Sequence, residues 1–378
     1  MTKHQIFDTY YHLLESKGIH DFGLTALKIR HSTPDFNKDH YESQTKTSFQ
    51  SRNEAYEHWV KFGRRNGLEY TPGKNTKLKI ILKAKDEPEL IDKWIQHHGE
   101  MVGLHNIIIL DCNSEDRQYL EKLNEYSHHV LVIKYPRYYD HIHNTEANKS
   151  FFSLISENSR YAAVLDADEF LIWKDAQDIS RSYPGKLLSE DTEIFCGTWL
   201  HNSRPPTQSN AEIDWNDPLN FRMTDSDIRS GTIAGKSIIR SDLLFKARHL
   251  GHNLHVKEVK DLTTPESFGK FLILHISDLG KEITKKRCLQ HLISKKVITK
   301  ADLSSVALPE KLARLVDDQS IHPSIRNYAR KILLHNSNNP SKEADTFATG
   351  ILNSATREPQ SELVKKIDRF DFSFNKTP

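Results

Sequence analysis

Short apolar runs alternate with helix-like segments between residues 78 and 165, and this alternation constrains the fold more than any other feature of the sequence. The runs contain β-branched and other apolar side chains bounded by turn-forming residues, which predicts buried strands. They are LKIILK (78–83), NIIIL (106–110), VLVIK (130–134) and YAAVL (161–165). Strands that alternate with helices predict an α/β fold with a mostly parallel sheet and helices on both of its faces.

The gaps between these runs carry the periodicity of amphipathic helices. The apolar faces are Leu90, Ile91, Trp94, Ile95 and His98 after the first run, Leu120 and Leu123 within 115–126, and Phe151, Phe152 and Ile155 within 145–158. Two further strands are predicted at EIFCGTWL (193–200) and KFLILHIS (270–277), with a loop-rich region between them.

Helical patterns flank the predicted sheet on both sides. Ala55, Trp59, Val60 and Phe62 lie near helical spacing, and Thr71-Pro72-Gly73 is typical of a linker. After about residue 285 the chain is polar and again helical in pattern. The sequence therefore predicts a helical module and linker over 1–75, a sheet domain over 76–290 and a helical region over 291–378.

Composition is informative mainly for the classes it excludes. Lys plus Arg number 53 and Asp plus Glu number 51, so the net charge of +2 gives no basic surface for nucleic acid. The apolar runs are too short to cross a bilayer, and the first residues lack the apolar core of a signal peptide. Three cysteines form no paired framework, which suits a reducing cytoplasm. A Rossmann dehydrogenase is disfavoured because no G-x-G-x-x-G follows the first run.

Acidic residues follow three of the four predicted strands. Lys85-Asp86-Glu87 follows the first, Asp111 to Asp116 follows the second, and Asp166-Ala167-Asp168-Glu169 follows the fourth. Ligands of parallel sheets bind at the carboxyl ends of the strands, and carboxylates gathered there repel one another unless a cation or donors lie among them. A single residue such as Asp111 or Asp116 has the alternative role of a helix N-cap.

The Asp-x-Asp pair in LDADEFL (165–171) is the sharpest of these signals, because it ends a fully apolar run. Two carboxylates one residue apart can direct oxygens toward one point, and oxygen ligands suit Mg²⁺ or Mn²⁺. Such a metal would bridge phosphate oxygens and neutralise charge on a leaving group.

The segment LKAKDEPELIDKWIQHHGEMVGLHNIIILDCNSEDR followed by YAAVLDADEFL resembles bacterial GT-A glycosyltransferases of the family-2-like class. The resemblance covers residues 78–173 and extends loosely through 196–203 and 235–240 to His275. One departure is Asp86, where the family more often has Asn. AYEHWVKFGRRNGLEYTP also resembles a small helical module found beside such enzymes. The resemblance implies a GT-A fold and metal-dependent transfer of a sugar, with a UDP-sugar favoured, to a cell-surface glycan or glycolipid.

The resemblance also implies roles for individual residues. Asp111 would contact the base or ribose of the donor nucleotide, and Lys85 and Glu87 would line its pocket. Asp166 would lie near the ribose and the hydration shell of the Mn²⁺ or Mg²⁺ ion, and Asp168 would bind that ion. Lys236 could hold diphosphate charge, as could Arg240, for which a solvated cation is the alternative.

The chain has 21 histidines, and a metal site would use one of them. His275, at the end of an apolar run, is the first choice as the third ligand, and His252 and His255 are rivals. Each has the alternative of a surface or structural histidine. His98 lies on the apolar face beside Trp94, which predicts a core histidine with satisfied hydrogen bonds.

An inverting transfer needs a carboxylate that takes the proton of the acceptor hydroxyl, and Asp225, Asp227 and Glu169 are the candidates. A retaining transfer needs no such base. A phosphoesterase or nucleotidyltransferase would use the same strand-end carboxylates and is the main alternative function. A metal-free carbohydrate-binding module or an inactive scaffold is a further alternative.

The acceptor class implied by the resemblance belongs to bacterial polysaccharide or lipopolysaccharide assembly. We therefore expect the chain in the cytoplasm, with peripheral contact to the inner membrane, where it would meet lipid-linked acceptors. The basic clusters Lys61/Arg64/Arg65 and Lys285/Lys286/Arg287 could make that contact, with a solvated surface as the alternative. The segment YPRYYDHIH (135–143) suits sugar stacking or an ordinary folded loop equally.

Overall fold

The structure is a computed structural model of the 378-residue chain. It describes residues 36–63, 66–72, 77–127, 129–135, 139–174, 179–180, 184–185, 188, 192–203, 220–222, 235–247, 250–252, 268–276 and 279–336. These residues divide between two compact units. One unit takes the described residues of 1–199 and 230–274, and the other takes those of 200–229 and 275–378. The three-part division expected from the sequence stays a prediction.

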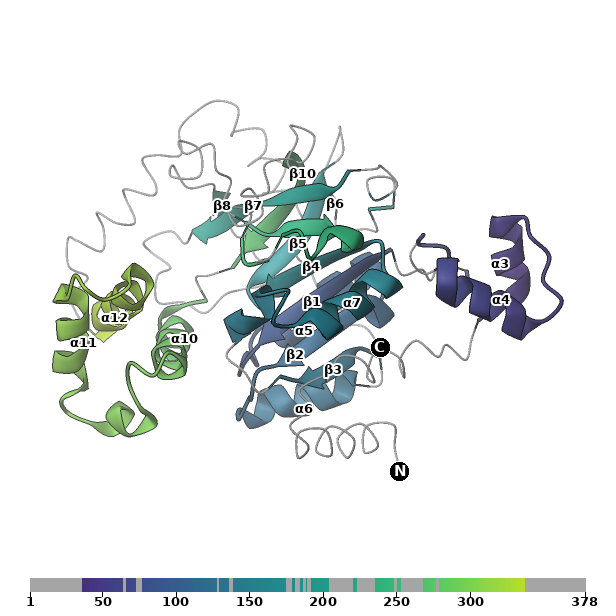
Figure 1. The fold of residues 1–378 in the computed structure, drawn as a ribbon. Coiled ribbons are helices and arrows are strands. Elements are labelled where there is room, and N and C mark those ends of the chain that lie inside the picture. The colour runs from purple at the N-terminus through teal and green to yellow at the C-terminus, as the bar shows by residue number, and fades with distance from the viewer. Residues whose placement is uncertain are drawn as a thin grey trace. The chain divides into compact units, whose positions relative to one another are not determined.

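The four predicted strands form the parallel half of the sheet. They are β1 (Leu78–Ala84), β2 (Ile107–Asp111), β3 (Leu131–Lys134) and β4 (Tyr161–Asp166). Their order is β3-β2-β1-β4, and each neighbouring pair is parallel (Figure 1). The α/β class is therefore confirmed, and β1 lies between two parallel neighbours.

The sheet continues beyond β4 with further strands, several of which form antiparallel pairs. These are β5 (Glu169–Lys174), β6 (Ile179–Ser180), β7 (Ile194–Ser203), β8 (Asn220–Arg222), β9 (Ser237–Arg240) and β10 (Phe268–His275). The sheet order is β3-β2-β1-β4-β9-β7-β10-β5-β6, with β8 paired to β7. Since β9 runs antiparallel to both β4 and β7, the direction of the strands changes at the edge of β4.

Helices cover both faces of the parallel half, as predicted. They are α5 (Ile91–Val102), α6 (Arg117–Tyr126) and α7 (Lys149–Asn158). On one face, Phe151 and Phe152 of α7 join a buried cluster with Ile108 and Leu110 of β2. On the other, a Cβ atom added at Gly99 of α5 would lie 4.0 Å from Ile107, whose side chain points to the face opposite that of Ile108.

The N-terminal part of the first unit has an aromatic core of its own. It contains α3 (Lys38–Thr45), α4 (Arg52–His58) and a π-helical turn over Trp59–Gly63. The buried residues of this core are Phe36, Tyr41, Phe49, Ala55, Trp59 and Tyr70. Gly63 is required there, because a Cβ atom at its position would lie 2.5 Å from the Trp59 ring.

In the second unit, a helical region follows β10. It comprises α10 (Lys281–Ser294), a 3₁₀ helix over Lys300–Ser304, α11 (Leu308–Asp317) and α12 (Pro323–Asn336). Cys288, Leu292, Leu312 and Ala329 belong to its buried cluster. Thr299 and Asp302 form a capping box at the 3₁₀ helix. Among the described residues, no helix has the length and apolar character needed to cross a membrane.

Candidate functional site

The register of the parallel strands brings the strand-end residues to one edge of the sheet. Ala84 at the end of β1 pairs with Asp111 at the end of β2, and Lys83 pairs with Asp166 at the end of β4. Short 3₁₀ turns over Leu104–Asn106, Tyr139–His143 and Ser241–Leu243 lie in connections of the same unit. The residues that the sequence placed after three different strands therefore gather at one end of β1.

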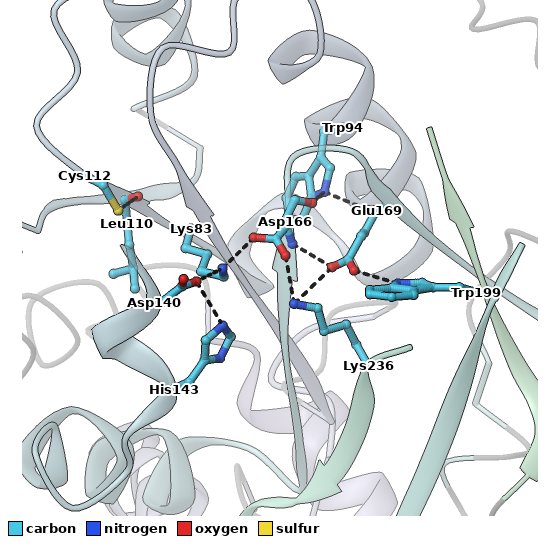
Figure 2. A network of polar contacts seen from close by, with 10 residues as sticks. All are labelled: Lys83, Trp94, Leu110, Cys112, Asp140, His143, Asp166, Glu169, Trp199 and Lys236. Atoms are coloured by element: carbon cyan, nitrogen blue, oxygen red, sulfur yellow. Dashed lines mark hydrogen bonds and ion pairs between the residues drawn. The ribbon is translucent and has the colours of Figure 1, made fainter. Parts of the chain in front are cut away.

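Asp166 is held between two buried lysines. Lys83 Nζ lies 2.7 Å from Asp166 Oδ1, and Lys236 Nζ lies 2.8 Å from Asp166 Oδ2 (Figure 2). The lysine side chains are 3% and 2% exposed, whereas the Asp166 side chain is 30% exposed. Both oxygens of the first carboxylate in the Asp-x-Asp pair are thus bound by cations of the chain itself.

Each lysine also contacts a second carboxylate. Lys83 Nζ is 2.9 Å from Asp140 Oδ1, and Lys236 Nζ is 3.6 Å from Glu169 Oε2. His143 Nε2 lies 4.0 Å from Asp140 Oδ1. Buried ammonium groups are costly unless they are paired, so this network accounts for how two lysines are tolerated inside the sheet edge.

These contacts fix the charge of the network. Burial by itself would raise the pKa of Asp166, but the ammonium groups of Lys236 and Lys83 outweigh it and hold that pKa well below its usual range. For Lys83, burial would lower the pKa, but Asp166 and Asp140 raise it above the usual value for lysine. Asp166 and Lys83 are therefore both charged near neutral pH.

Glu169 is fully buried, and both of its oxygens accept hydrogen bonds from within the chain. The backbone N–H of Asp166 donates to Oε2 at 2.8 Å, and the Trp199 indole N–H donates to Oε1 at 2.7 Å. A carboxylate in this position orients its neighbours, and its burial does not favour the role of catalytic base. That role for Glu169 stays a prediction.

Three side chains of α5 hold the backbone between β4 and β5. The Trp94 indole N–H donates to the carbonyls of Asp166 at 3.1 Å and Glu169 at 3.0 Å. In β5, Leu171 is bound through both of its backbone polar groups. His97 Nε2 lies 2.6 Å from the Leu171 carbonyl, and the Leu171 N–H donates to His98 Nε2 at 3.1 Å. The turn that carries Asp166 and Asp168 is therefore fixed through its main chain.

His98 is a core histidine, as predicted. Its Nδ1 is 2.9 Å from the Trp94 carbonyl, and its Nε2 accepts from Leu171, which specifies a neutral ring protonated on Nδ1. Burial is the main reason that the pKa of His98 lies well below its usual value, and His97 adds to the effect.

Asp86 locks together the loops that follow β1 and β2. Its Oδ1 accepts from the backbone N–H groups of Glu115 at 2.6 Å and Asp116 at 2.7 Å, and its own N–H donates to Ser114 Oγ. Asp86 has a φ of 53°, in the left-handed region, which Asp and Asn tolerate better than most residues. The Asp86 side-chain oxygen therefore accepts two backbone hydrogen bonds that an Asn side-chain oxygen could also accept.

Asp111 and Asp116 have different positions in the second loop. Asp111 is buried, and burial raises its pKa, although a hydrogen bond from the Ser114 N–H at 3.1 Å opposes that shift. Asp116 is the N-cap of α6 and accepts from the Tyr119 N–H. The N-cap alternative thus holds for Asp116, whereas Asp111 lies at the strand end beside β1.

The remaining residues implied for the donor site lie at the same strand ends. Glu87 is buried, and its carbonyl accepts from the N–H of Ile91 at the start of α5. Lys85 is partly exposed after β1, and Asp168 is 7% exposed in the turn after β4. Arg240 makes ion pairs with Glu193 and Asp242 away from Asp166, which matches the solvated-cation alternative.

The described residues show no complete ligand set for the predicted divalent metal, so that metal stays a prediction. Within the part of the chain that the structure describes, no group of three His, Cys, Asp or Glu side chains is arranged to hold a metal ion. Asp166 is already bound by two ammonium groups. His275 ends β10 and belongs to the second unit, so its role stays a prediction, and His252 stacks edge-on against the Trp199 ring at 5.0 Å. His255, Asp225 and Asp227 lie outside the described residues.

Sequence reasoning missed Lys83, Asp140 and Trp199. Lys83 had a detectable signal, because it is one of two lysines, with Lys79, in a buried strand whose other residues are apolar. Asp140 and Trp199 had none, since they reach the site through contacts between distant segments. Cys112 is also near the network, but burial raises its pKa to about 12, so it is not a nucleophile at neutral pH.

No protein-family model matches the sequence, and no curated protein matches it. Among solved structures, the chain is similar to the mannosyltransferase PcManGT from Pyrobaculum calidifontis in complex with GDP-Man and Mn²⁺, with 12% identity, a TM-score of 0.32, and coverage of 76% of this chain and 78% of that one. It is similar to residues 1–349 of S. aureus TarS in complex with UDP, with 11% identity, a TM-score of 0.31, and coverage of 72% and 92%.

A third similar structure is glucosyl-3-phosphoglycerate synthase from Mycobacterium tuberculosis in complex with Mn²⁺, UDP and its product. The identity is 12%, the TM-score is 0.32, and the coverage is 61% of this chain and 78% of that one. Overlap of this extent assigns no activity to the chain, so its function has to be inferred from its own residues.

Proposed function

We propose that the chain is a glycosyltransferase that takes a sugar from a nucleotide-diphosphate donor, with a UDP-sugar favoured. The observation that carries this proposal is the gathering of Asp111, Asp166 and Asp168 with Lys83 and Lys236 at the carboxyl ends of parallel strands. This edge is where doubly wound sheets bind nucleotides. The resemblance of residues 78–173 to family-2-like glycosyltransferases supports the same activity.

The parts of the donor would meet different residues of this edge. Asp111 offers a carboxylate to hydroxyl or imide groups of the nucleoside, and Lys85 and Glu87 flank the same strand ends. Lys83 and Lys236 offer positive charge to the diphosphate. Asp168 lies in the turn held by α5 and would face the sugar-phosphate end of the donor.

In the transfer, an acceptor hydroxyl oxygen forms a bond to the anomeric carbon of the donor sugar. The anomeric C–O bond to the diphosphate breaks, and its electron pair leaves on the phosphate oxygen. The transition state resembles an oxocarbenium ion, so positive groups near the phosphate stabilise the charge that develops there. In an inverting reaction the hydroxyl proton passes to a base, for which Asp225 and Asp227 remain candidates.

The acceptor that we propose is a cell-surface glycan or a glycolipid, and the place of action is the cytoplasmic side of the membrane. Both follow from the resemblance. Contact through a basic cluster such as Lys61, Arg64 and Arg65 would let the chain reach lipid-linked acceptors.

A panel of UDP-, GDP- and CMP-sugars tests the activity. We expect one donor to raise the melting temperature and to be hydrolysed slowly to the nucleoside diphosphate and free sugar. Asp168→Asn should reduce that turnover at least tenfold while leaving the melting temperature of the unliganded chain nearly unchanged. The proposal fails if no donor shifts the melting temperature, or if Asp168→Asn turns over like the wild type.

The products separate this activity from its main alternative. A phosphoesterase or nucleotidyltransferase would cleave a P–O bond and release a nucleoside monophosphate or a sugar phosphate. A glycosyltransferase cleaves the anomeric C–O bond. Hydrolysis in ¹⁸O-labelled water should therefore place the label on the sugar, and label on phosphate would contradict the proposal.

A further inference from the structure

Lys83 and Lys236 occupy the position at Asp166 that a divalent cation would need. One ammonium group lies on each oxygen of this carboxylate, at 2.7 Å and 2.8 Å. Both lysines are almost completely buried, and they come from β1 and from the residue before β9.

A divalent ion that joined Asp166 would face both ammonium groups at close range. Like charges repel strongly in a partly buried site. The carboxylate also has no oxygen left that is without a bound cation. The absence of any three-ligand group among the described residues agrees with this picture.

We propose that Lys83 and Lys236 bind the diphosphate of the donor directly, in place of a divalent metal ion at Asp166. This inference rests on the proposed function, because it names how that same site receives the anionic part of its donor. The two ammonium groups are supplied by the fold, and Asp166 keeps them in position when no donor is bound.

Asp140 holds the place of the incoming anion. It is the most exposed carboxylate of the network, with a side chain 43% exposed, and it lies in the short 3₁₀ turn Tyr139–His143. Its Oδ1 is 2.9 Å from Lys83 Nζ, a distance typical of a charge-assisted bond to a phosphate oxygen as well. The network has three carboxylates, Asp140, Asp166 and Glu169, for two lysines. We therefore expect a phosphate that binds Lys83 to compete with Asp140.

This arrangement predicts that removing the negative charge of Asp140 strengthens the binding of a phosphate-containing ligand. Asp140→Asn removes both a competitor and a negative charge, so it should strengthen the binding of UDP, GDP or inorganic pyrophosphate by about threefold or more. A purely structural role for Asp140 would instead weaken binding or leave it unchanged.

The test measures UDP, GDP and pyrophosphate binding to the full chain by calorimetry, with EDTA and then with Mn²⁺. We expect binding of at least one nucleotide in EDTA, with an affinity within about threefold of that in Mn²⁺. Lys83→Met and Lys236→Met should each weaken it by about tenfold or more, since each removes a charge-assisted contact.

Lys79→Met is the matched control. Lys79 is 1% exposed on the same strand as Lys83, at its other end, where its Nζ is 3.5 Å from Asn106 Oδ1. The Lys79→Met variant removes a buried lysine from β1 and leaves the contacts of Asp166 in place. Its nucleotide affinity should therefore stay unchanged. If the lysine variants do not fold, Asp140→Asn alone decides, because unchanged or weaker pyrophosphate binding by that variant overturns the inference.

The other outcomes separate this inference from the function on which it rests. Nucleotide binding that requires Mn²⁺ and survives Lys236→Met would overturn the lysine site and leave the glycosyltransferase standing. No binding of any nucleotide or nucleotide-sugar in either condition would overturn both.

Discussion

His98 and Trp94 show how single side chains of α5 determine the geometry of the turn that carries Asp166 and Asp168. Both residues are fully buried, and neither is assigned a contact with the donor. They act on backbone groups of β4 and β5, and each uses a ring nitrogen for this purpose. At the scale of the residue, the site therefore depends on groups that a motif search centred on the carboxylates does not include.

The neutral state of His98 predicts a specific pH dependence of stability. Unfolded His98 takes up a proton below its ordinary pKa of 6.5, whereas the native residue does not, because its pKa is lowered. The unfolded state then binds more protons, so lowering the pH below 6.5 destabilises the fold through this residue, with a limiting slope of about 1.4 kcal/mol per pH unit. Denaturant unfolding from pH 7 to 5 should show that slope in the wild type and its loss in His98→Gln. Parallel slopes would contradict the prediction.

Trp94→Phe replaces the indole with a smaller phenyl ring and removes its N–H. It leaves two buried carbonyls, those of Asp166 and Glu169, without this donor, which should cost about 1–3 kcal/mol in the free energy of unfolding. Donor affinity should also fall, because the turn loses its anchor.

Trp59→Phe is the control for that variant. The Trp59 indole N–H donates to the Leu68 carbonyl at 3.0 Å in the N-terminal aromatic core. The Trp59→Phe variant should lower the free energy of unfolding in the same way and leave donor affinity unchanged. Equal loss of affinity in both variants would show that α5 does not position the turn. Urea unfolding and nucleotide titration provide the two readouts.

Sequence reasoning found residues whose signal is local and missed those whose partners are distant. Asp111, Asp166 and Asp168 follow apolar runs, so their place at the strand ends could be predicted. The pairing of Asp166 with Lys236 could not, because 70 residues separate the two and β9 brings them together only in the folded sheet. The lysine pairing at Asp166 was missed for the same reason, and the metal predicted there stays a prediction.

At the scale of the element, the loops after β1 and β2 act as one structure. Asp86 links them through three hydrogen bonds, and the second loop contains another left-handed residue, Asn113 at a φ of 59°. The position of Asp111 therefore depends on both loops. Strand prediction succeeded here because parallel strands are buried on both faces and appear as continuous apolar runs.

Asp86→Ala should destabilise the fold by about 1–3 kcal/mol, because two backbone N–H groups lose their acceptor and alanine tolerates the left-handed φ poorly. Asp86→Asn should stay within about 1 kcal/mol of the wild type, since its amide oxygen can accept the same bonds. Chemical denaturation of both variants measures the difference. Equal losses for Ala and Asn would indicate that charge, rather than the hydrogen bonds, is the contribution of Asp86.

The antiparallel strands were harder to predict than the parallel ones. β5 begins one residue after the Asp-x-Asp pair at 166–168, and β9 has only four residues. Short strands of this kind gain their stability from their neighbours, Tyr161 to Ala163 on β4 in the case of β9. Their pairing is a tertiary property that local propensity does not encode.

At the scale of the whole molecule, the buried side chains form separate clusters. The N-terminal aromatic core around Trp59, the cluster beneath α7 and the helical cluster around Leu312 share no residue. The helical flanks were predicted from periodicity, but the division between the two units was not. The second unit includes residues from two distant segments, so no boundary at a single position could describe it.

Separate clusters predict unfolding in more than one step. Leu312→Ala removes a fully buried side chain from the C-terminal helical cluster and should cost about 2–5 kcal/mol there. Differential scanning calorimetry should show one transition moved to lower temperature, while nucleotide binding is retained. Leu82→Ala, in the centre of β1, should move the other transition instead. A single transition shifted equally by both variants would contradict the prediction.

The attachment of α5 to main-chain atoms of the Asp166–Leu171 turn has a consequence for how such a site can change over time. Every residue except proline has the carbonyl and the amide hydrogen that Trp94, His97 and His98 bind. Substitutions at 167 or 168 therefore leave the hydrogen bonds from α5 to this backbone in place, even where they change the reactivity of the site. Evolution or protein design could therefore replace the side chains of this turn while the hydrogen bonds from Trp94, His97 and His98 keep its backbone in position.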